Sequence, residues 1–275
     1  MKRYAVFPIL ALGGGCAGFA LRMLQWRTGF EPDTGLPIPG TLFGPLTAAL
    51  AALSLVLCFL LRKKLPEEQE GAPIFPAGFS VMDPGILTLA VAGIFLMAAS
   101  GLADMAAGMG VQGLPGMAAV SAVSPREYLI QGLLTLAAAV CLFPAVPACR
   151  MGGHEEPRPF NGILLLAPVV CLVVRLVLVY RQDSANPVLA AYWVELLALV
   201  LVILALYRLA AFAYGAGRTR RFVLYAVPAI LLCLASLADG GLSCLLFNGG
   251  AALTLTGFLL QRLTALSRPW DEYAA

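Results

Sequence analysis

One stretch of the sequence decides the fold class. Residues 191–214 read AYWVELLALVLVILALYRLAAFAY, in which only Glu195 and Arg208 are charged. A helix needs about 20 mostly apolar residues to cross the hydrocarbon core of a bilayer, so this stretch predicts a transmembrane helix. Seven further stretches have the same character: 4–25, 42–61, 85–104, 128–148, 162–180, 222–238 and 242–262. The sequence predicts an all-α, polytopic membrane protein with about eight transmembrane helices, forming a single domain over residues 1–275.

The composition agrees with a chain that is surrounded by lipid. Of the 275 residues, 60% are hydrophobic and 12% are charged, and the mean hydropathy is +0.88. Soluble proteins average roughly 45–50% apolar and about 25% charged residues, so this chain has too few charges to cover a water-exposed globule. These values exclude a soluble enzyme, a nucleic-acid-binding module, a coiled coil and a disordered linker.

The positions of lysine and arginine predict how the chain threads through the membrane. If the N-terminus is cytoplasmic, 12 of the 18 basic residues lie on the inner side, four lie outside and two lie within helices. Cytoplasmic loops are enriched in these residues. We therefore expect both termini in the cytoplasm and the chain in the cell membrane, which is the cytoplasmic membrane if the source is bacterial.

The first apolar stretch is expected to stay in the mature protein as a helix. It continues to about Gln25, beyond the roughly 7–15 apolar residues of a signal-peptide core. Gly14 and Gly18 within it form a GxxxG pair, which lets another helix approach closely. Packing within the bundle and a dimer contact are both open, and the first is the more common explanation.

The sequence contains no pattern typical of a metal, cofactor or disulfide site. The seven cysteines are odd in number and include no CxxC pair, which favours buried free thiols. The single histidine, His154, lies in a polar loop and has no cysteine partner at a spacing typical of a metal site. We expect no metal, no cofactor and no nucleic-acid partner, and no recognisable catalytic motif is present.

Three ionisable residues form the candidate intramembrane polar site. Arg175 lies five residues before the outer end of helix 162–180, and Glu195 lies at a similar depth in helix 191–214. At ~1.5 Å per residue, both lie about 6–8 Å below the outer boundary. Because consecutive helices with a short connection usually pack side by side, we expect Arg175 and Glu195 to form an ion pair. Asp104 ends helix 85–104 on the same side.

Ionisable groups inside a membrane are candidates for function. In the functional interpretation, the pair lines a polar vestibule or gates a pathway. In the alternative, it only holds two helices together, or each side chain reaches separately to the outer interface. The segment 105–127 is rich in glycine, alanine and methionine, and either lies on the membrane or dips into it as a re-entrant loop.

Architecture and the polar site together favour a transport component, or the membrane subunit of a larger assembly, for a small or lipid-like solute. The expected partners are the lipid bilayer and such a solute or a partner membrane subunit. An alternative is a sensor or scaffold that contacts a cytoplasmic partner through residues 218–221 and the C-terminal tail. The last-ranked alternative is an intramembrane enzyme acting on lipid, which would have to use Asp104, Glu195 or Arg175.

Overall fold

The structure, a computed structural model, describes residues 4–31, 36–66, 75–81, 83–110, 124–150, 160–183 and 188–267. Within these ranges, eight helices are long and apolar enough to cross a membrane, which confirms the predicted all-α membrane bundle. They are α1 (Val6–Thr28), α2 (Phe43–Leu61), α3 (Pro84–Gly108), α4 (Pro125–Leu142), α6 (Ile163–Asp183), α7 (Leu189–Ala213), α8 (Thr219–Ser236) and α9 (Leu242–Leu266). No strand occurs in this part of the chain, only two isolated bridges.

Most helix boundaries lie within about one turn of the predicted ones. The exception is the fourth stretch, which divides at Pro144 into α4 and the short α5 (Ala145–Ala148). Proline lacks the backbone N–H that a helix interior needs. At the start of α3, Asp83 caps the helix by accepting a hydrogen bond from the Gly85 N–H, and Pro84 occupies the first turn.

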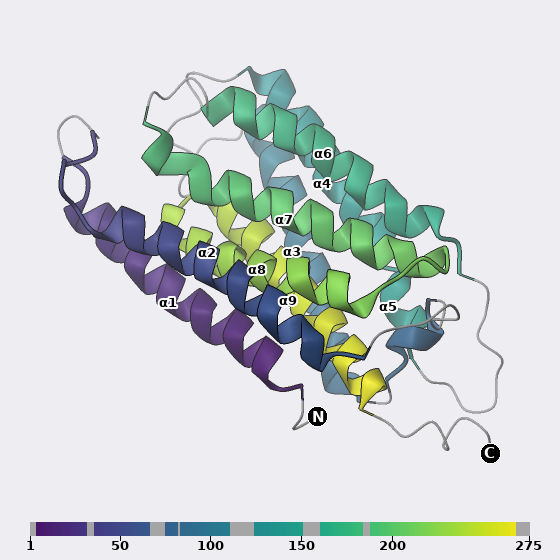
Figure 1. Cartoon of the computed structure of the whole chain (residues 1–275). Helices are drawn as coiled ribbons and strands as arrows, with labels where there is room; N and C mark the ends of the chain where they lie inside the picture. Colours follow the sequence, from purple (N-terminus) through teal and green to yellow (C-terminus); the bar gives the residue numbers. More distant parts are fainter. Residues whose placement is uncertain are drawn as a thin grey trace, which may run out of the picture.

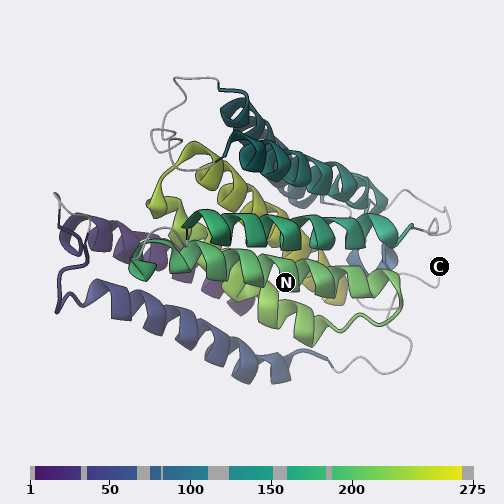
Figure 2. The same ribbon diagram turned by 90° about the horizontal axis from the view of Figure 1, so that it is seen from above.

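Six of the helices pack in a closed cycle. Helix α3 packs on α4, α4 on α6, α6 on α7, α7 on α8, α8 on α9, and α9 packs back on α3. Helices α1 and α2 pack on the outside of α8 (Figure 1; Figure 2). Helix α8 is consequently the most enclosed, with 67% of its apolar window buried, against 28% for α1 and 22% for α2.

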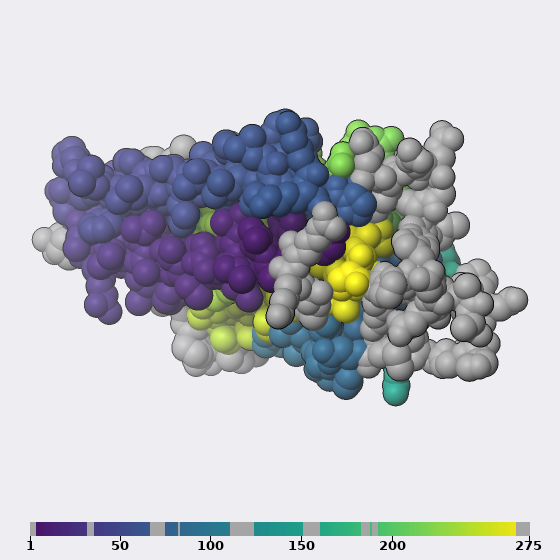
Figure 3. All heavy atoms as spheres, turned by 60° about the horizontal axis from the view of Figure 1, so that its bottom comes forward, coloured from purple at the N-terminus to yellow at the C-terminus, as the bar shows by residue number. Residues whose placement is uncertain are grey.

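The two N-terminal helices form one broad face of the molecule. Figure 3 shows α1 and α2 lying side by side across it. Large apolar side chains point outward here, among them Ile9, Leu53 and Phe59, which are 67%, 53% and 49% exposed. In a bilayer, such side chains contact acyl chains, so this face has the composition expected of a lipid-facing surface.

The helices alternate in direction, and this defines two ends of the bundle. Helix α1 begins and α9 ends at the same end, called here the terminal end (Figure 1). The other end, where α1 ends and α9 begins, is called the far end. The predicted cytoplasmic position of the terminal end remains a prediction.

Glycines let α3 approach α4 very closely. A Cβ atom on Gly101 would lie 2.7 Å from the carbonyl oxygen of Gly132, and a Cβ atom on Gly132 would lie 2.5 Å from the carbonyl oxygen of Gly101. The two backbones therefore touch, which is typical of small residues at membrane helix interfaces. Asp104 on α3 and Gln131 on α4 lie within a turn of this contact.

The GxxxG pair of α1 serves packing within the bundle. A Cβ atom on Gly14 would lie 2.6 Å from Leu231 Cδ1, and a Cβ atom on Gly18 would lie 3.0 Å from the Cβ atom of Ala235. Both of these partners are on α8. Of the two explanations left open by the sequence, the structure supports the internal contact.

The chain between α2 and α3 enters the core at the terminal end. It forms the turn η2 (Ala77–Phe79), whose Phe79 side chain is fully buried. The ring of Phe79 packs edge-on against Phe212, with ring centroids 5.1 Å apart, and Arg262 donates a hydrogen bond of 2.6 Å to the Gly78 carbonyl oxygen. This packing helps to bury the Arg262 side chain, which is 1% exposed.

Two features singled out in the sequence fall outside the described part of the chain. The first residues of the segment 105–127 belong to α3, and its last residues belong to α4. Residues 111–123 between them are not described. The loop that contains His154 is not described either.

Candidate functional site

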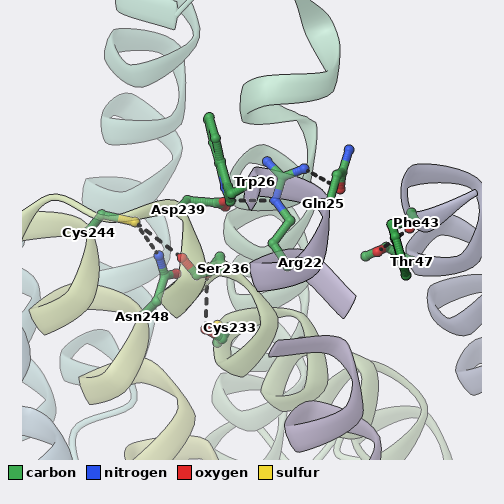
Figure 4. A network of polar contacts seen from close by, with 10 residues as sticks. All are labelled: Arg22, Gln25, Trp26, Phe43, Thr47, Cys233, Ser236, Asp239, Cys244 and Asn248. Atoms are coloured by element: carbon green, nitrogen blue, oxygen red, sulfur yellow. Dashed lines mark hydrogen bonds and ion pairs between the residues drawn. The ribbon is translucent and has the colours of Figure 1, made fainter. Parts of the chain in front are cut away.

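Arg22 and Asp239 form a buried ion pair at the far end. Arg22 Nε lies 2.5 Å from Asp239 Oδ1, and the two side chains are 0% and 7% exposed (Figure 4). Arg22 lies on α1, and Asp239 ends the turn η4 (Leu237–Asp239) that follows α8. The close packing of α1 on α8 and on η4 brings them together, although 217 positions separate them in the sequence.

Two further side chains of α1 form hydrogen bonds with this pair. The Arg22 Nη1 atom donates a hydrogen bond of 2.9 Å to Gln25 Oε1, and Trp26 Nε1 donates one of 2.9 Å to Asp239 Oδ1 (Figure 4). One oxygen of the Asp239 carboxylate thus accepts two hydrogen bonds. The other, Oδ2, is buried and has no hydrogen-bond partner.

A glycine turn holds Asp239 in this position. Gly240 and Gly241 have φ angles of +81° and +78°. Residues other than glycine rarely adopt such angles. The chain therefore reverses tightly between η4 and α9, and Asp239 stays at the far end beside α1.

Glu195 on α7 reaches the same region from the other side. It lies within hydrogen-bonding reach of the Cys244 thiol on α9. Asn248, one turn further along α9, directs its Nδ2 atom toward Cys244 Sγ at 3.2 Å (Figure 4). The Asn248 side chain is fully buried, and its Oδ1 atom has no donor. We call Arg22, Glu195, Asp239, Cys244 and Asn248 the Arg22 cluster.

The Arg22 cluster contains two carboxyl groups and one guanidinium group. With both carboxylates ionised, it contains one positive and two negative charges. It also contains two buried acceptor oxygens without donors, Asp239 Oδ2 and Asn248 Oδ1. Such atoms are costly to leave unsatisfied in a protein interior, at about 1–3 kcal/mol each. The arrangement is suited to a group that brings positive charge and N–H or O–H donors.

A second polar cluster lies inside the six-helix cycle. Arg175 on α6 donates hydrogen bonds of 2.8 Å to Asp104 Oδ2 on α3 and 2.5 Å to Thr135 Oγ1 on α4. Gln131 on α4 donates to the same Asp104 oxygen at 3.4 Å. The Arg175 guanidinium also lies 4.4 Å from the ring centroid of Phe247 on α9. We call Asp104, Gln131, Thr135 and Arg175 the Arg175 cluster.

The Arg175 cluster is neutral and almost completely enclosed. The Arg175 and Asp104 side chains are each 2% exposed. The two clusters meet at neighbouring residues of α9, because Phe247 contacts Arg175 and the next residue, Asn248, contacts Cys244. The Arg175 cluster thus fixes α3, α4 and α6 next to the part of α9 that contributes to the Arg22 cluster.

The predicted ion pair between Arg175 and Glu195 is wrong. Helices α6 and α7 do pack together as expected, but Arg175 points across the cycle to Asp104, whereas Glu195 points to Cys244. Side chains at similar depth on neighbouring helices meet only when both face the shared interface. All three predicted site residues lie at the far end, but in two clusters instead of one.

Sequence reasoning missed Arg22 and Asp239 as site residues. Neither residue is among the three that the sequence predicts for the polar site. A signal was available for Arg22, which lies inside the first apolar stretch, as Arg175 lies inside the fifth. Nothing in the local sequence distinguishes Asp239 from other loop acids.

No group of three or more His, Cys, Asp or Glu side chains in the described ranges is arranged to hold a metal ion.

Comparison of the chain with protein-family models, with curated proteins and with solved structures finds no match. The functional argument therefore depends on the geometry of these clusters.

Proposed function

We propose that this multi-pass membrane protein is a transport component that takes up a small organic cation at the Arg22 cluster. One observation supports this most directly. Asp239 Oδ2 and Asn248 Oδ1 are buried acceptors without donors, in a cluster with an excess of carboxylate groups. A protonated amine supplies both the missing N–H donors and the compensating charge.

The location favours a solute that enters from the far end. Glu195 is half-buried, and Trp26, which contacts Asp239, is 36% exposed. The cluster also lies where α8 ends, the chain turns and α9 begins. The first N–H groups and the last C=O groups of a helix have no partner within that helix, so the ends of α8 and α9 bring further polar backbone groups to this region.

An organic cation fits these residues better than a metal ion. Hard metal ions take six or more oxygen ligands, and the described part of the Arg22 cluster offers two carboxylates, one amide and a thiol. No observation within the described ranges favours the sensor, scaffold or enzyme alternatives over transport.

The test measures charge movement in reconstituted protein. The full chain is incorporated into liposomes, adsorbed on a solid-supported membrane and exposed to methylammonium or to tetramethylammonium, which has the same charge but no N–H donor. We expect a transient current with methylammonium and a clearly smaller one with tetramethylammonium. Glu195→Gln and Asp239→Asn are expected to abolish the difference.

Glu127→Gln is the matched control. Glu127 also lies near the far end, but it pairs with the exposed Arg181 outside both clusters. This variant is expected to behave as the unmodified chain. Equal currents from protein-containing and protein-free liposomes, or an unchanged response of Glu195→Gln, would contradict the proposal.

A further inference from the structure

A groove lies between α2 and α8, away from both polar clusters. It has a volume of about 330 Å³ and is lined by Leu55, Val56, Phe59, Leu224 and Tyr225. Val56 and Phe59 are 54% and 49% exposed, so the groove opens on the outer surface of the bundle. Since α2 belongs to the lipid-facing side, an acyl chain is the apolar group that meets this groove in a membrane.

Arginines lie beside two of the lining rings. The Arg62 guanidinium is 3.7 Å from the ring centroid of Phe59, and the Arg208 guanidinium is 5.8 Å from that of Tyr225. These rings come from the two different helices that line the groove. The Nε atom of Arg208 is buried and has no hydrogen-bond partner. Cations therefore flank the groove just after the end of α2 and on α7.

More basic side chains lie close to Arg62, at the terminal end of the bundle. The turn η1 (Arg62–Lys64) continues α2, packs on α8, and exposes Lys63 and Lys64. Arg220 binds the Leu65 carbonyl oxygen beside it, at 3.0 Å. The described carboxylates at the terminal end are limited to that of Asp83, which caps α3; residues 67, 68 and 70, which are glutamates, lie outside the described ranges.

We propose that this groove binds an anionic glycerophospholipid. One acyl chain lies against Val56 and Leu224, and the lipid phosphate lies between Arg62 and Arg208 at the terminal end. Guanidinium groups bind phosphate through paired N–H donors, and the unpartnered Arg208 Nε provides one such donor. This inference is independent of the proposed transport function, because the groove shares no residue with the Arg22 cluster.

The test is native mass spectrometry of the full chain released from detergent micelles. Dioleoyl-phosphatidylglycerol and dioleoyl-phosphatidylcholine are added separately, since they differ in headgroup charge but have the same acyl chains. We expect tighter binding of the anionic lipid. Each basic residue near a membrane surface contributes about fivefold in affinity for anionic lipid, so Arg62→Gln and Arg208→Gln are each expected to reduce that preference about fivefold.

Two further variants separate the site from general charge attraction. Arg126→Gln removes an exposed arginine at the far end and is expected to keep the full preference. Val56→Phe fills the groove from its lipid-exposed side without changing charge, and it is expected to weaken binding of both lipids. Because Val56 is outside the core, this variant tests the groove even if Arg208→Gln fails to fold.

Equal binding of the two lipids by the unmodified chain would overturn the proposal. An equal loss in Arg126→Gln and Arg62→Gln would also overturn it, because attraction would then be nonspecific. Complete displacement of the lipid by inorganic phosphate would do the same, since the acyl chain would then contribute nothing.

Discussion

Arg175 on α6 forms an ion pair of 2.8 Å with Asp104 on α3, although 71 positions separate them in the sequence. Both side chains are nearly inaccessible, and Thr135 on α4 accepts a further hydrogen bond from the same guanidinium nitrogen. The pair thus links three helices at one point.

Removal of one member of this pair is expected to destabilise the bundle strongly. Arg175→Ala leaves the Asp104 carboxylate buried without its cation, and breaking buried pairs in this way costs about 3–5 kcal/mol. The free energy of unfolding in mixed detergent micelles, followed by circular dichroism, measures the effect. Arg181→Gln is the control, because Arg181 is 64% exposed in its pair with Glu127, and we expect a change below about 1 kcal/mol.

The reversed pair, Arg175→Asp with Asp104→Arg, is expected to recover part of the lost stability. A double variant as unstable as the sum of the single variants would show that their mutual attraction contributes nothing. Recovery by the double variant separates the ion pair from the packing of each side chain.

Gly132→Ala is expected to force α3 and α4 apart. Its Cβ atom would lie 2.5 Å from the Gly101 carbonyl oxygen and 2.8 Å from the Met105 nitrogen, both backbone atoms that cannot rotate away. Gly13→Ala is the matched control, since a Cβ atom there meets no other atom within 4 Å. Thermal unfolding in detergent should show a lower midpoint for Gly132→Ala and no loss for Gly13→Ala, where alanine favours the helix by up to about 1 kcal/mol. Equal midpoints would contradict the close helix contact.

Trp26 is expected to report on the Arg22–Asp239 pair by its fluorescence. Its indole N–H donates to Asp239 Oδ1. In a chain with the other two tryptophans replaced by phenylalanine, Asp239→Leu removes this acceptor and should shift the Trp26 emission. Asp239→Asn keeps an acceptor oxygen of the same shape, so its emission should stay close to that of the unmodified residue. Identical shifts in both variants would show that the hydrogen bond is not the cause.

Cysteine labelling tests the predicted orientation. Cys149 is fully buried, and burial raises the pKa of its thiol, so it remains a poorly reactive thiol at neutral pH. Cysteines introduced at Lys63 and at Thr41 lie near the terminal and far ends. A membrane-impermeant maleimide added to intact cells should label Thr41→Cys and not Lys63→Cys. Permeabilised cells provide the control, in which both positions react. Labelling of Lys63→Cys in intact cells would reverse the predicted topology.

The number and the approximate limits of the membrane helices could be predicted from the sequence. A helix is stable across a bilayer when it contains enough consecutive apolar residues, and this number can be read directly from the sequence. The division at Pro144 was not predicted, because prolines also occur in continuous membrane helices, as Pro168 in α6 and Pro228 in α8 do. The close contacts of Gly101 with Gly132 were not predicted either, since no spacing rule links glycines on different helices.

The polar clusters depended on the tertiary structure. The intramembrane position of Arg175 and Glu195 follows from their place in apolar stretches of the sequence. Their distance from the ends of these stretches also predicts that both lie at the same end of the bundle. Their partners depend on the direction in which each side chain leaves its helix and on the order in which the helices pack. These properties bring Arg22 to Asp239 and Arg175 to Asp104 across the bundle. The stability of a helix in lipid depends on the composition of that helix alone, whereas an ion pair forms only when particular faces of two helices meet.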